Sequence, residues 1–297
     1  MQTTESPLRM MAAGFARDRI AVAALAVLIL VLLSAVFAPV VTPQNPYDLA
    51  QLDILDSKLP PGAKSLDGKS YWLGTDEQGR DMLSAILYGL RISLGVAVLA
   101  TVAALAIGMA IGLLAGYAGG WTDGLVMRLV DLQLSFPAIL IALVLLAVTG
   151  PGVDKIVIAL IAVQWAYYAR TVRGIVLVEK GKEYVEAARC LAFGNARILF
   201  RHILPNCLPP LTVVATVQVA HAIALEATLS FLGLGVPITS PSLGLLIANG
   251  FVHLLSGKYW ISFFPGVALL ITIVAINLIG DQLRDILNPR LGSHYGA

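Results

Sequence analysis

Residues 183–205 read EYVEAARCLAFGNARILFRHILP and form the longest polar segment between apolar runs in the second half of the chain. Helical spacing gives the first part of the segment an apolar and a charged face, which predicts a surface helix. The apolar face comprises Tyr184, Ala187, Ala188 and Leu191, and the charged face comprises Lys182, Glu183, Glu186 and Arg189. Gly194 and Asn195 interrupt the pattern, and we expect a second short helix over 196–203 that Pro205 stops. A helix, a turn and a helix make a rigid knob suited to a socket on another protein.

The rest of the chain has the composition of a membrane protein. Of its 297 residues 58% are hydrophobic and only 13% are charged, whereas soluble domains average about 25% charged residues. Two of its apolar runs, 20–41 and 91–118, exceed the ~20 residues that cross a bilayer. The net charge of +2 is too small to indicate nucleic acid. Cys190 and Cys207 fit no metal spacing, and we expect reduced thiols on the cytoplasmic side.

We therefore predict an all-α polytopic membrane protein with six transmembrane helices. The expected spans are 20–41, 91–118, 129–149, 154–168, 208–232 and 261–280. The first is longer than the apolar run of about 7–15 residues in a signal peptide, so we expect it to remain uncleaved. A turn is expected over 121–128, an interruption at Pro137, and a short surface helix over 242–255. The expected divisions are a cytoplasmic N-terminus (1–19), the first helix (20–41), an extracytoplasmic loop with a surface helix (42–90), a five-helix core (91–282) containing a cytoplasmic loop (174–206), and a cytoplasmic tail (283–297).

The second span carries a glycine every four residues. Gly108, Gly112, Gly116 and Gly120 line one face of the expected helix without side chains. Such a face lets another helix approach closely. We assign these glycines to helix packing rather than to chemistry.

Basic residues predict the orientation of the chain. With both termini inside, the inner segments hold 13 of the 20 Lys and Arg residues and the outer segments hold 7. An excess of positive charge marks the cytoplasmic side. Residues 183–205 therefore face the cytoplasm in this prediction.

The outer loop contains LGTDEQGRD, residues 73–81. Its two glycines suit tight turns, and its aspartates can accept hydrogen bonds from nearby backbone N–H groups. The residues singled out are Gly74, Thr75, Asp76, Gly79, Arg80 and Asp81. Asp81 or Ser84 is expected to cap the next helix.

No motif of the chain indicates an active site. The sequence has no phosphate-binding Gly-x-x-x-x-Gly-Lys-Ser/Thr string, no His-Glu-x-x-His and no Gly-x-Ser-x-Gly. Its four histidines are scattered singly. Glu226 is the clearest ionisable residue within a span, and two interpretations stay open. With Ser230, it lines the path or its outer gate, or it makes a structural hydrogen bond or ion pair.

Residues 183–205 resemble the EAA loop of ABC-importer permeases. Glu186, Ala187, Ala188, Leu204 and Pro205 match that pattern, while Ala192 stands in place of its Gly and His202 in place of its Ile. We expect Gly194 to carry the turn that Ala192 leaves without a glycine. The strings LGTDEQGRD, EATLSFLGLG (226–235) and DQLRDILNPRL (281–291) look like those of the dipeptide/oligopeptide (peptide/nickel) branch, second permease subunit type.

This resemblance implies a non-catalytic subunit of the bacterial inner membrane with the type I ABC-importer fold. It implies a heterodimer with a related permease, cytoplasmic ATPase subunits that bind ATP and Mg, an extracytoplasmic solute-binding protein, surrounding lipid, and no cofactor on this chain. The implied coupling residues are Glu183, Glu186, Ala187, Ala188, Arg189, Ala192, Gly194, Asn195, His202, Leu204 and Pro205. Di- or oligopeptides are the expected cargo, with nickel, glutathione or haem as alternatives. An ion-coupled carrier using Glu226 and a non-transporting membrane scaffold are the alternatives from other classes.

Overall fold

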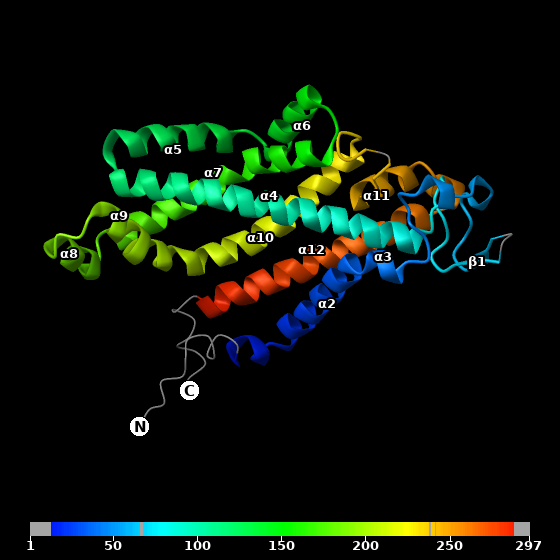
Figure 1. Cartoon of the computed structure of the whole chain (residues 1–297), viewed down its shortest axis with the longest axis horizontal. Coiled ribbons are helices and arrows are strands. Elements are labelled where there is room, and N and C mark those ends of the chain that lie inside the picture. The colour runs from blue at the N-terminus through cyan, green and yellow to red at the C-terminus, as the bar shows by residue number, and fades with distance from the viewer. Residues whose placement is uncertain (1–12, 66–67, 238, 241, 288–297) are drawn as a thin grey trace.

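The computed structural model describes residues 13–65, 68–237, 239–240 and 242–287. Most of the molecule is helical, with one small hairpin at one end (Figure 1). The α-helices are α2 (Arg19–Val36), α3 (Ala38–Val41), α4 (Met82–Ala118), α5 (Gly120–Ser135), α6 (Ala138–Thr149), α7 (Val153–Glu179), α8 (Glu183–Cys190), α9 (Asn195–Arg197), α10 (Leu204–Phe231), α11 (Leu243–Phe251) and α12 (Trp260–Leu287). The shorter elements are 3-10 helices η1 (Leu49–Gln51), η2 (Ile54–Asp56) and η4 (Leu254–Ser256), π-helix η3 (Ile198–Ile203), and antiparallel strands β1 (Ala63–Lys64) and β2 (Ser70–Tyr71).

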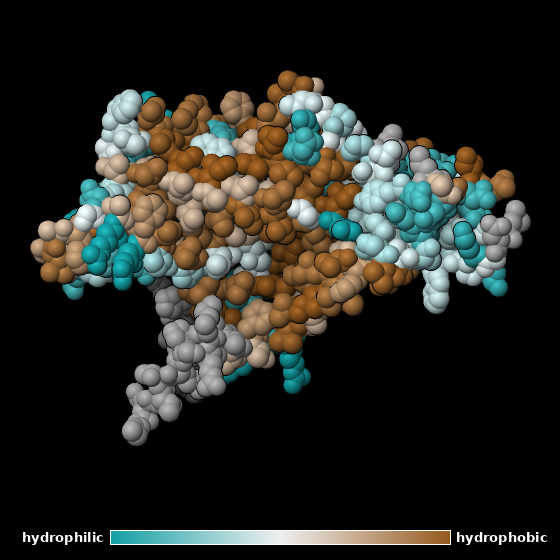
Figure 2. Space-filling view, viewed as in Figure 1, coloured by the Kyte–Doolittle hydropathy of each residue, from teal (hydrophilic) through white to brown (hydrophobic). Residues whose placement is uncertain are grey.

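The long helices give the molecule an apolar middle and polar ends (Figure 2). Within the described residues, α2, α4, the continuous helix Asn195–Phe231 and α12 are each long and apolar enough to cross a membrane. The pair α5 and α6, bent by 88°, adds a fifth span. Helix α7 packs along α4 and completes the bundle. It is not among these candidate spans, because Gln164, Arg170 and Arg173 lower its hydropathy. The architecture agrees with the predicted fold class.

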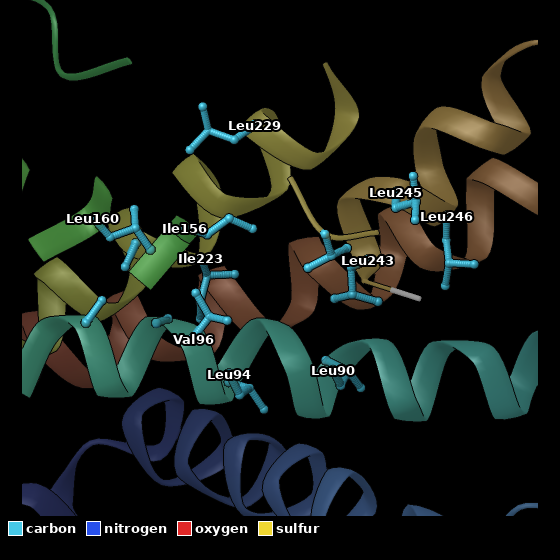
Figure 3. Close-up of a cluster of buried hydrophobic side chains, with 14 of the residues drawn as sticks. Leu90, Leu94, Val96, Ile156, Leu160, Ile223, Leu229, Leu243, Leu245 and Leu246 are labelled. Atoms are coloured by element: carbon cyan, nitrogen blue, oxygen red, sulfur yellow. The ribbon is translucent and has the colours of Figure 1, made fainter. Parts of the chain in front are cut away.

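The main core lies where α4, α7, α10, α11 and α12 meet. Figure 3 shows side chains from four of these helices in one cluster, among them Leu90, Ile156, Ile223 and Leu243. Ile156, Ile223 and Leu243 are completely buried. The close packing of these side chains gives dispersion contacts that are lost if the helices separate.

The predicted glycine face packs α4 against α7. A Cβ atom built on Gly108, Gly112 or Gly116 would lie 3.0 Å or less from atoms of α7, such as the Ala169 carbonyl oxygen 2.5 Å from that of Gly112. The backbones therefore approach as closely as the absence of side chains allows. Gly120 does not belong to this face, because α4 ends at Ala118 and Gly120 begins α5 with φ 57° and no atom within 4 Å of its Cβ position.

An ion pair inside the outer motif stabilises the extramembrane end. Arg80 Nε lies 2.6 Å from Asp76 Oδ2, and both side chains are 1% exposed. Asp76 Oδ1 also accepts the backbone N–H groups of Gln78 (2.8 Å) and Arg80 (2.9 Å). These bonds satisfy the buried carboxylate, whereas Arg80 Nη2 is buried without a hydrogen-bond partner among the described residues. The motif is thus a structural element.

The same motif joins the outer end to two helices. Gly74 and Gly79 have φ of 80° and 74°, in the region that favours glycine. The carbonyl of Thr75 accepts a hydrogen bond from the Trp260 indole of α12 at 3.1 Å. Asp81 caps α4, with its Oδ2 accepting the N–H of Ser84 at 2.8 Å. Asp81 rather than Ser84 is the cap.

Several helices are longer than the apolar runs that predicted them. Residues 82–90, assigned to the outer loop, belong to α4, and 121–128, expected as a turn, lie within α5. Helix α7 runs on to Glu179, whereas α11 stops at Phe251 and η4 covers 254–256. Hydropathy marks where a helix enters the bilayer, whereas caps and turns decide where it ends. Residues 1–12 and 288–297, which include most of both predicted terminal segments, lie outside the described residues.

Prolines act differently at three positions. The first helix breaks at Phe37, before α3, which has Pro39 in its first turn. Pro137 separates α5 from α6, as the expected interruption of the third span. Pro205 lies in the first turn of α10 and does not stop a helix, contrary to our prediction, because the helix from Asn195 continues through η3 to Phe231. The π-helical turn η3 lies directly before Pro205, and such a local change of hydrogen-bond register lets a helix continue past the missing N–H.

The glycine contact predicts a large difference between two substitutions on one helix. Gly112→Ala places a methyl group against the α7 backbone and should destabilise the chain by about 1–3 kcal/mol. Gly95→Ala on α4 meets no atom of the described residues within 4 Å and is the matched control, expected to unfold at the parental temperature or slightly above it because alanine is the better helix former. Thermal unfolding of the purified proteins in detergent measures both. Equal midpoints for the two variants would mean that α4 and α7 do not pack through Gly112.

Candidate functional site

The knob, defined here as residues 182–203, projects from one end of the bundle. It connects the end of α7 to the start of α10 and contains α8, α9 and η3. In Figure 1 it lies at the opposite end from the β1 hairpin. Its position outside the apolar middle leaves it available to a partner.

Buried apolar side chains hold α8 to the bundle. Val185 is completely buried and Ala188 is 3% exposed, and both pack in a cluster with Val176 of α7 and Ile203 of η3. The apolar face predicted from the sequence packs only in part against the bundle, since Ala187 is exposed and Leu191 is 67% exposed. Apolar residues occur on two sides of this helix, so the pattern alone did not show which side packs.

A polar network supports the base of the knob. Glu179, at the end of α7, accepts hydrogen bonds from Lys182 Nζ at 2.5 Å and from the Tyr184 hydroxyl at 2.6 Å. Asn206 Nδ2 donates to the same hydroxyl oxygen at 3.1 Å. Burial, followed by the hydrogen bond to Glu179, raises the pKa of Tyr184 to about 12. The phenol therefore stays protonated near neutral pH and keeps donating to Glu179.

The turn after α8 is centred on Ala192, not on Gly194. Ala192 has φ 56°, whereas Gly194 has φ −62° and ψ 148°, which any residue can adopt. The N–H of Phe193 donates to the Ala188 carbonyl (3.1 Å) and that of Ala192 to the Arg189 carbonyl (2.9 Å). These two bonds form a Schellman motif, whose left-handed residue is usually glycine. The turn thus lies where the family pattern has Gly, and our assignment to Gly194 was wrong.

The outward side of the knob combines charge with apolar surface. Glu183, Glu186, Ala187 and Arg189 are exposed on α8, next to the exposed Leu191. Among the described residues, neither Glu186 nor Arg189 has an ion-pair partner. Such a surface can form both apolar contacts and salt bridges with another protein.

The remaining predicted coupling residues serve the base of the knob. Asn195 Oδ1 accepts the Tyr117 hydroxyl at 2.9 Å, which ties α9 to the end of α4. The His202 ring stacks on Phe193 with centroids 5.9 Å apart. Leu204 and Pro205 form the first turn of α10.

Glu226 and Ser230 lie inside the protein. Glu226 is completely buried and accepts hydrogen bonds from Ser93 of α4 and from Ser230, each at 2.7 Å. The carboxylate therefore joins α10 to α4. This geometry favours the structural interpretation that the sequence left open.

The sequence did not single out the contacts that tie α4 and α5 to α7. Lys180 Nζ donates to the Tyr117 carbonyl at 2.6 Å, and Arg173 makes a bidentate pair with Asp123, at 2.8 and 2.6 Å. The isolated charges near the helix ends could have marked these residues as candidates for pairing. Their partners, however, lie 50 or more residues away in the sequence and can be identified only from the fold.

Comparisons with known proteins agree on one kind of protein. The sequence model described as binding-protein-dependent transport system inner membrane component matches residues 108–293. The one described as the N-terminal TM domain of oligopeptide transport permease C matches 6–61.

Curated relatives cover nearly the whole chain. The dipeptide transport system permease protein DppC of Escherichia coli (strain K12) is 43% identical over 93% of this chain and 91% of its own length. The di/tripeptide transport system permease protein DppC of Pseudomonas aeruginosa (strain UCBPP-PA14) is 38% identical, with coverages of 96% and 93%. An inward-facing structure of the MetNI methionine ABC transporter matches with TM-score 0.58 at 20% identity, covering 69% of this chain and 97% of that one, and supports the fold.

The Ala192 turn predicts that glycine stabilises the knob. A non-glycine residue in the left-handed region costs about 1–2 kcal/mol, part of which glycine's extra freedom in the unfolded state offsets. Ala192→Gly should therefore slow hydrogen exchange at the Phe193 amide severalfold. Gly194→Ala, which has no atom within 4 Å of its Cβ position, should leave exchange close to the parent. Faster exchange in Gly194→Ala, with none of the expected slowing in Ala192→Gly, would place the turn at Gly194.

Proposed function

The chain belongs to the family of binding-protein-dependent transport system inner membrane components, and on that premise we propose that it is the permease subunit of an ATP-driven importer of di- or oligopeptides. Relatives named as dipeptide and di/tripeptide permeases, at 36–43% identity, support the cargo class. The observation that carries the mechanism is the exposed knob fixed to two long helices of the bundle.

Energy reaches this chain through the knob. The sequence has no phosphate-binding loop, so ATP and Mg bind to partner ATPase subunits, and this chain catalyses no hydrolysis itself. The exposed side of α8, with Glu186, Ala187 and Leu191, docks in a groove of an ATPase. Val185 and Ala188 anchor α8 to α7 and to η3, and η3 continues into α10. A displacement of α8 therefore moves α7 and α10 with it. Alternating access follows when ATP binding changes which arrangement of helices is favoured.

The membrane partners follow from the same arrangement. Large apolar side chains are exposed along the bundle, for example Leu129 (54%), Val144 (64%) and Leu270 (61%). A related permease subunit covers part of this surface to complete the translocation path, and lipid covers the rest. The solute-binding protein docks at the opposite end from the knob, on the outer domain that the buried Asp76–Arg80 pair stabilises.

The knob end faces the cytoplasm in this proposal. The excess of Lys and Arg on the inner segments supports that orientation. The residues before α2 contact the end of α12, as in the hydrogen bond from Gln282 to the Gly14 carbonyl at 3.5 Å. Both ends of the described chain therefore lie together, which supports placing both termini in the cytoplasm.

Glu226 and Ser230 form a structural junction that holds α10 to α4 inside the bundle, rather than lining the path. A carboxylate with two serine hydroxyl partners at 2.7 Å fixes one arrangement of these helices. Opening the outer side requires α10 and α4 to separate or slide. Breaking the hydrogen bond between Glu226 and Ser93 therefore contributes to the free-energy cost of opening.

Charge reversal on the knob tests the coupling. Glu186→Lys changes an exposed residue, so folding and insertion should be spared. If Glu186 lies at the interface, the new charge contact should cost about 1.4 kcal/mol or more of binding free energy. This cost lowers the affinity for the ATPase tenfold or more. The measurements are ATP-dependent uptake of a labelled dipeptide, with nickel and glutathione as cargo controls, and the amount of ATPase that copurifies with the permease.

Asp285→Lys is the matched control, since Asp285 is exposed on α12 outside the knob. We expect normal copurification and uptake for this control and loss of both for Glu186→Lys. Parental values for Glu186→Lys would remove the docking role from α8.

The native cysteines provide a test of orientation. Cys190 is exposed on α8 and Cys207 is buried. An impermeant thiol reagent should leave Cys190 unlabelled in intact cells and label it after permeabilisation. In a Cys190→Ser background, Lys69→Cys on the exposed outer hairpin should be labelled in intact cells. Labelling of Cys190 from outside would reverse the orientation.

A further inference from the structure

A groove of ≈ 560 Å³ lies between the knob and the end of α4. Leu114 and Tyr117 of α4 line one side, and Arg189 of α8, Asn195 of α9 and Phe200 of η3 line another, with Lys180 at the base. The groove shares Arg189 with the outward side of α8 but lies on the side of α8 that faces α4, and neither the sequence motifs nor the names of the relatives assign it a ligand.

The polar groups of the groove are mainly hydrogen-bond donors. Lys180 Nζ donates to the Tyr117 carbonyl at 2.6 Å and keeps further N–H groups. The Arg189 guanidinium has no ion-pair partner among the described residues. Asn195 uses its carbonyl oxygen to accept the Tyr117 hydroxyl at 2.9 Å, which leaves its amide N–H groups to donate. None of the described residues that line the groove carries a carboxylate, so the groove suits an anion.

The walls of the groove are apolar and lie at the border of the apolar middle of the molecule. Leu114 and Phe200 are each 60% exposed, although both are large hydrophobic side chains. Leu114 lies one turn before the end of α4, and Lys180 lies one residue beyond the end of α7. An anion with an apolar tail matches this combination better than a free inorganic anion does.

We propose that the groove binds an anionic phospholipid of the cytoplasmic leaflet. Its phosphate contacts Arg189 and Lys180, and an acyl chain lies along Leu114 and Phe200. Basic pockets between helices on the cytoplasmic side bind lipid headgroups in this way. The leaflet rests on the orientation given under the proposed function. Because the lipid would touch both α4 and the knob, membrane composition would influence how firmly the knob is held.

The test measures lipid retained by the purified permease–ATPase complex. The complex is incorporated into nanodiscs of phosphatidylcholine and phosphatidylglycerol and then re-extracted, and the bound lipid is quantified by mass spectrometry. The parent should be enriched in phosphatidylglycerol. Arg189→Gln and Lys180→Gln should each reduce that enrichment about fivefold, the equivalent of about 1 kcal/mol per basic residue at a membrane surface.

Three controls separate the outcomes. Arg128→Gln, an exposed arginine on α5 outside the groove, should retain the parental enrichment, and Arg189→Lys should largely restore it. Added inorganic phosphate should not displace the lipid. Equal lipid retention in the parent, Arg189→Gln and Lys180→Gln overturns the proposal, as does displacement by phosphate. So does loss of ATPase copurification in Arg189→Gln with lipid unchanged, which would make the groove an ATPase contact.

The cysteine labelling described above separates this proposal from the proposed function. Labelling of Cys190 in intact cells would overturn the orientation and the choice of leaflet, even with selective lipid retention. Absence of selective retention with Cys190 protected would overturn the lipid site alone.

Discussion

The attachment of α8 to the bundle is the constraint on which the rest of the structure depends. Val185 and Ala188 are buried against α7 and η3, and Glu179 fixes the base through Lys182 and Tyr184. From α7 the contact continues to α4 through Gly108, Gly112 and Gly116, which contact both backbone atoms and Cβ atoms of α7. Packed interfaces of this kind do not deform gradually, so a force on the knob is passed to whole helices.

The chain divides its polar residues between structure and recognition. At the outer end, Asp76 is buried and pairs with Arg80 Nε, although Arg80 Nη2 has no hydrogen-bond partner among the described residues, and within the bundle Glu226 accepts hydrogen bonds from two serines. At the knob, by contrast, Glu186 and Arg189 are exposed without ion-pair partners among the described residues. Charges that a protein leaves unpaired at its surface are available for another molecule, and these two border the proposed ATPase contact and the lipid groove.

Hydropathy and motif spacing predicted the all-helical membrane fold, the glycine packing face and the position of the knob. The details that failed depend on contacts that a single sequence does not reveal. Ala192 accepts the left-handed conformation because two backbone hydrogen bonds of the Schellman motif hold it there, which outweighs its steric preference. Val185 faces inward because α7 and η3 lie on that side, and Pro205 does not stop the helix because the π-helical turn η3 lies directly before it. Ser93, one of the two partners of Glu226, is 133 positions away in the sequence, and Tyr117, the partner of Lys180, is 63 positions away.

The central claim is that the exposed side of α8 contacts an ATPase and moves with it. A photoreactive amino acid at Ala187, which is exposed at the middle of α8, tests it directly in the assembled transporter. Irradiation should join the permease to the ATPase, and the yield should change when ATP binds without hydrolysis. Crosslinks to lipid alone, or to the ATPase with a yield indifferent to nucleotide, would contradict coupling through the knob.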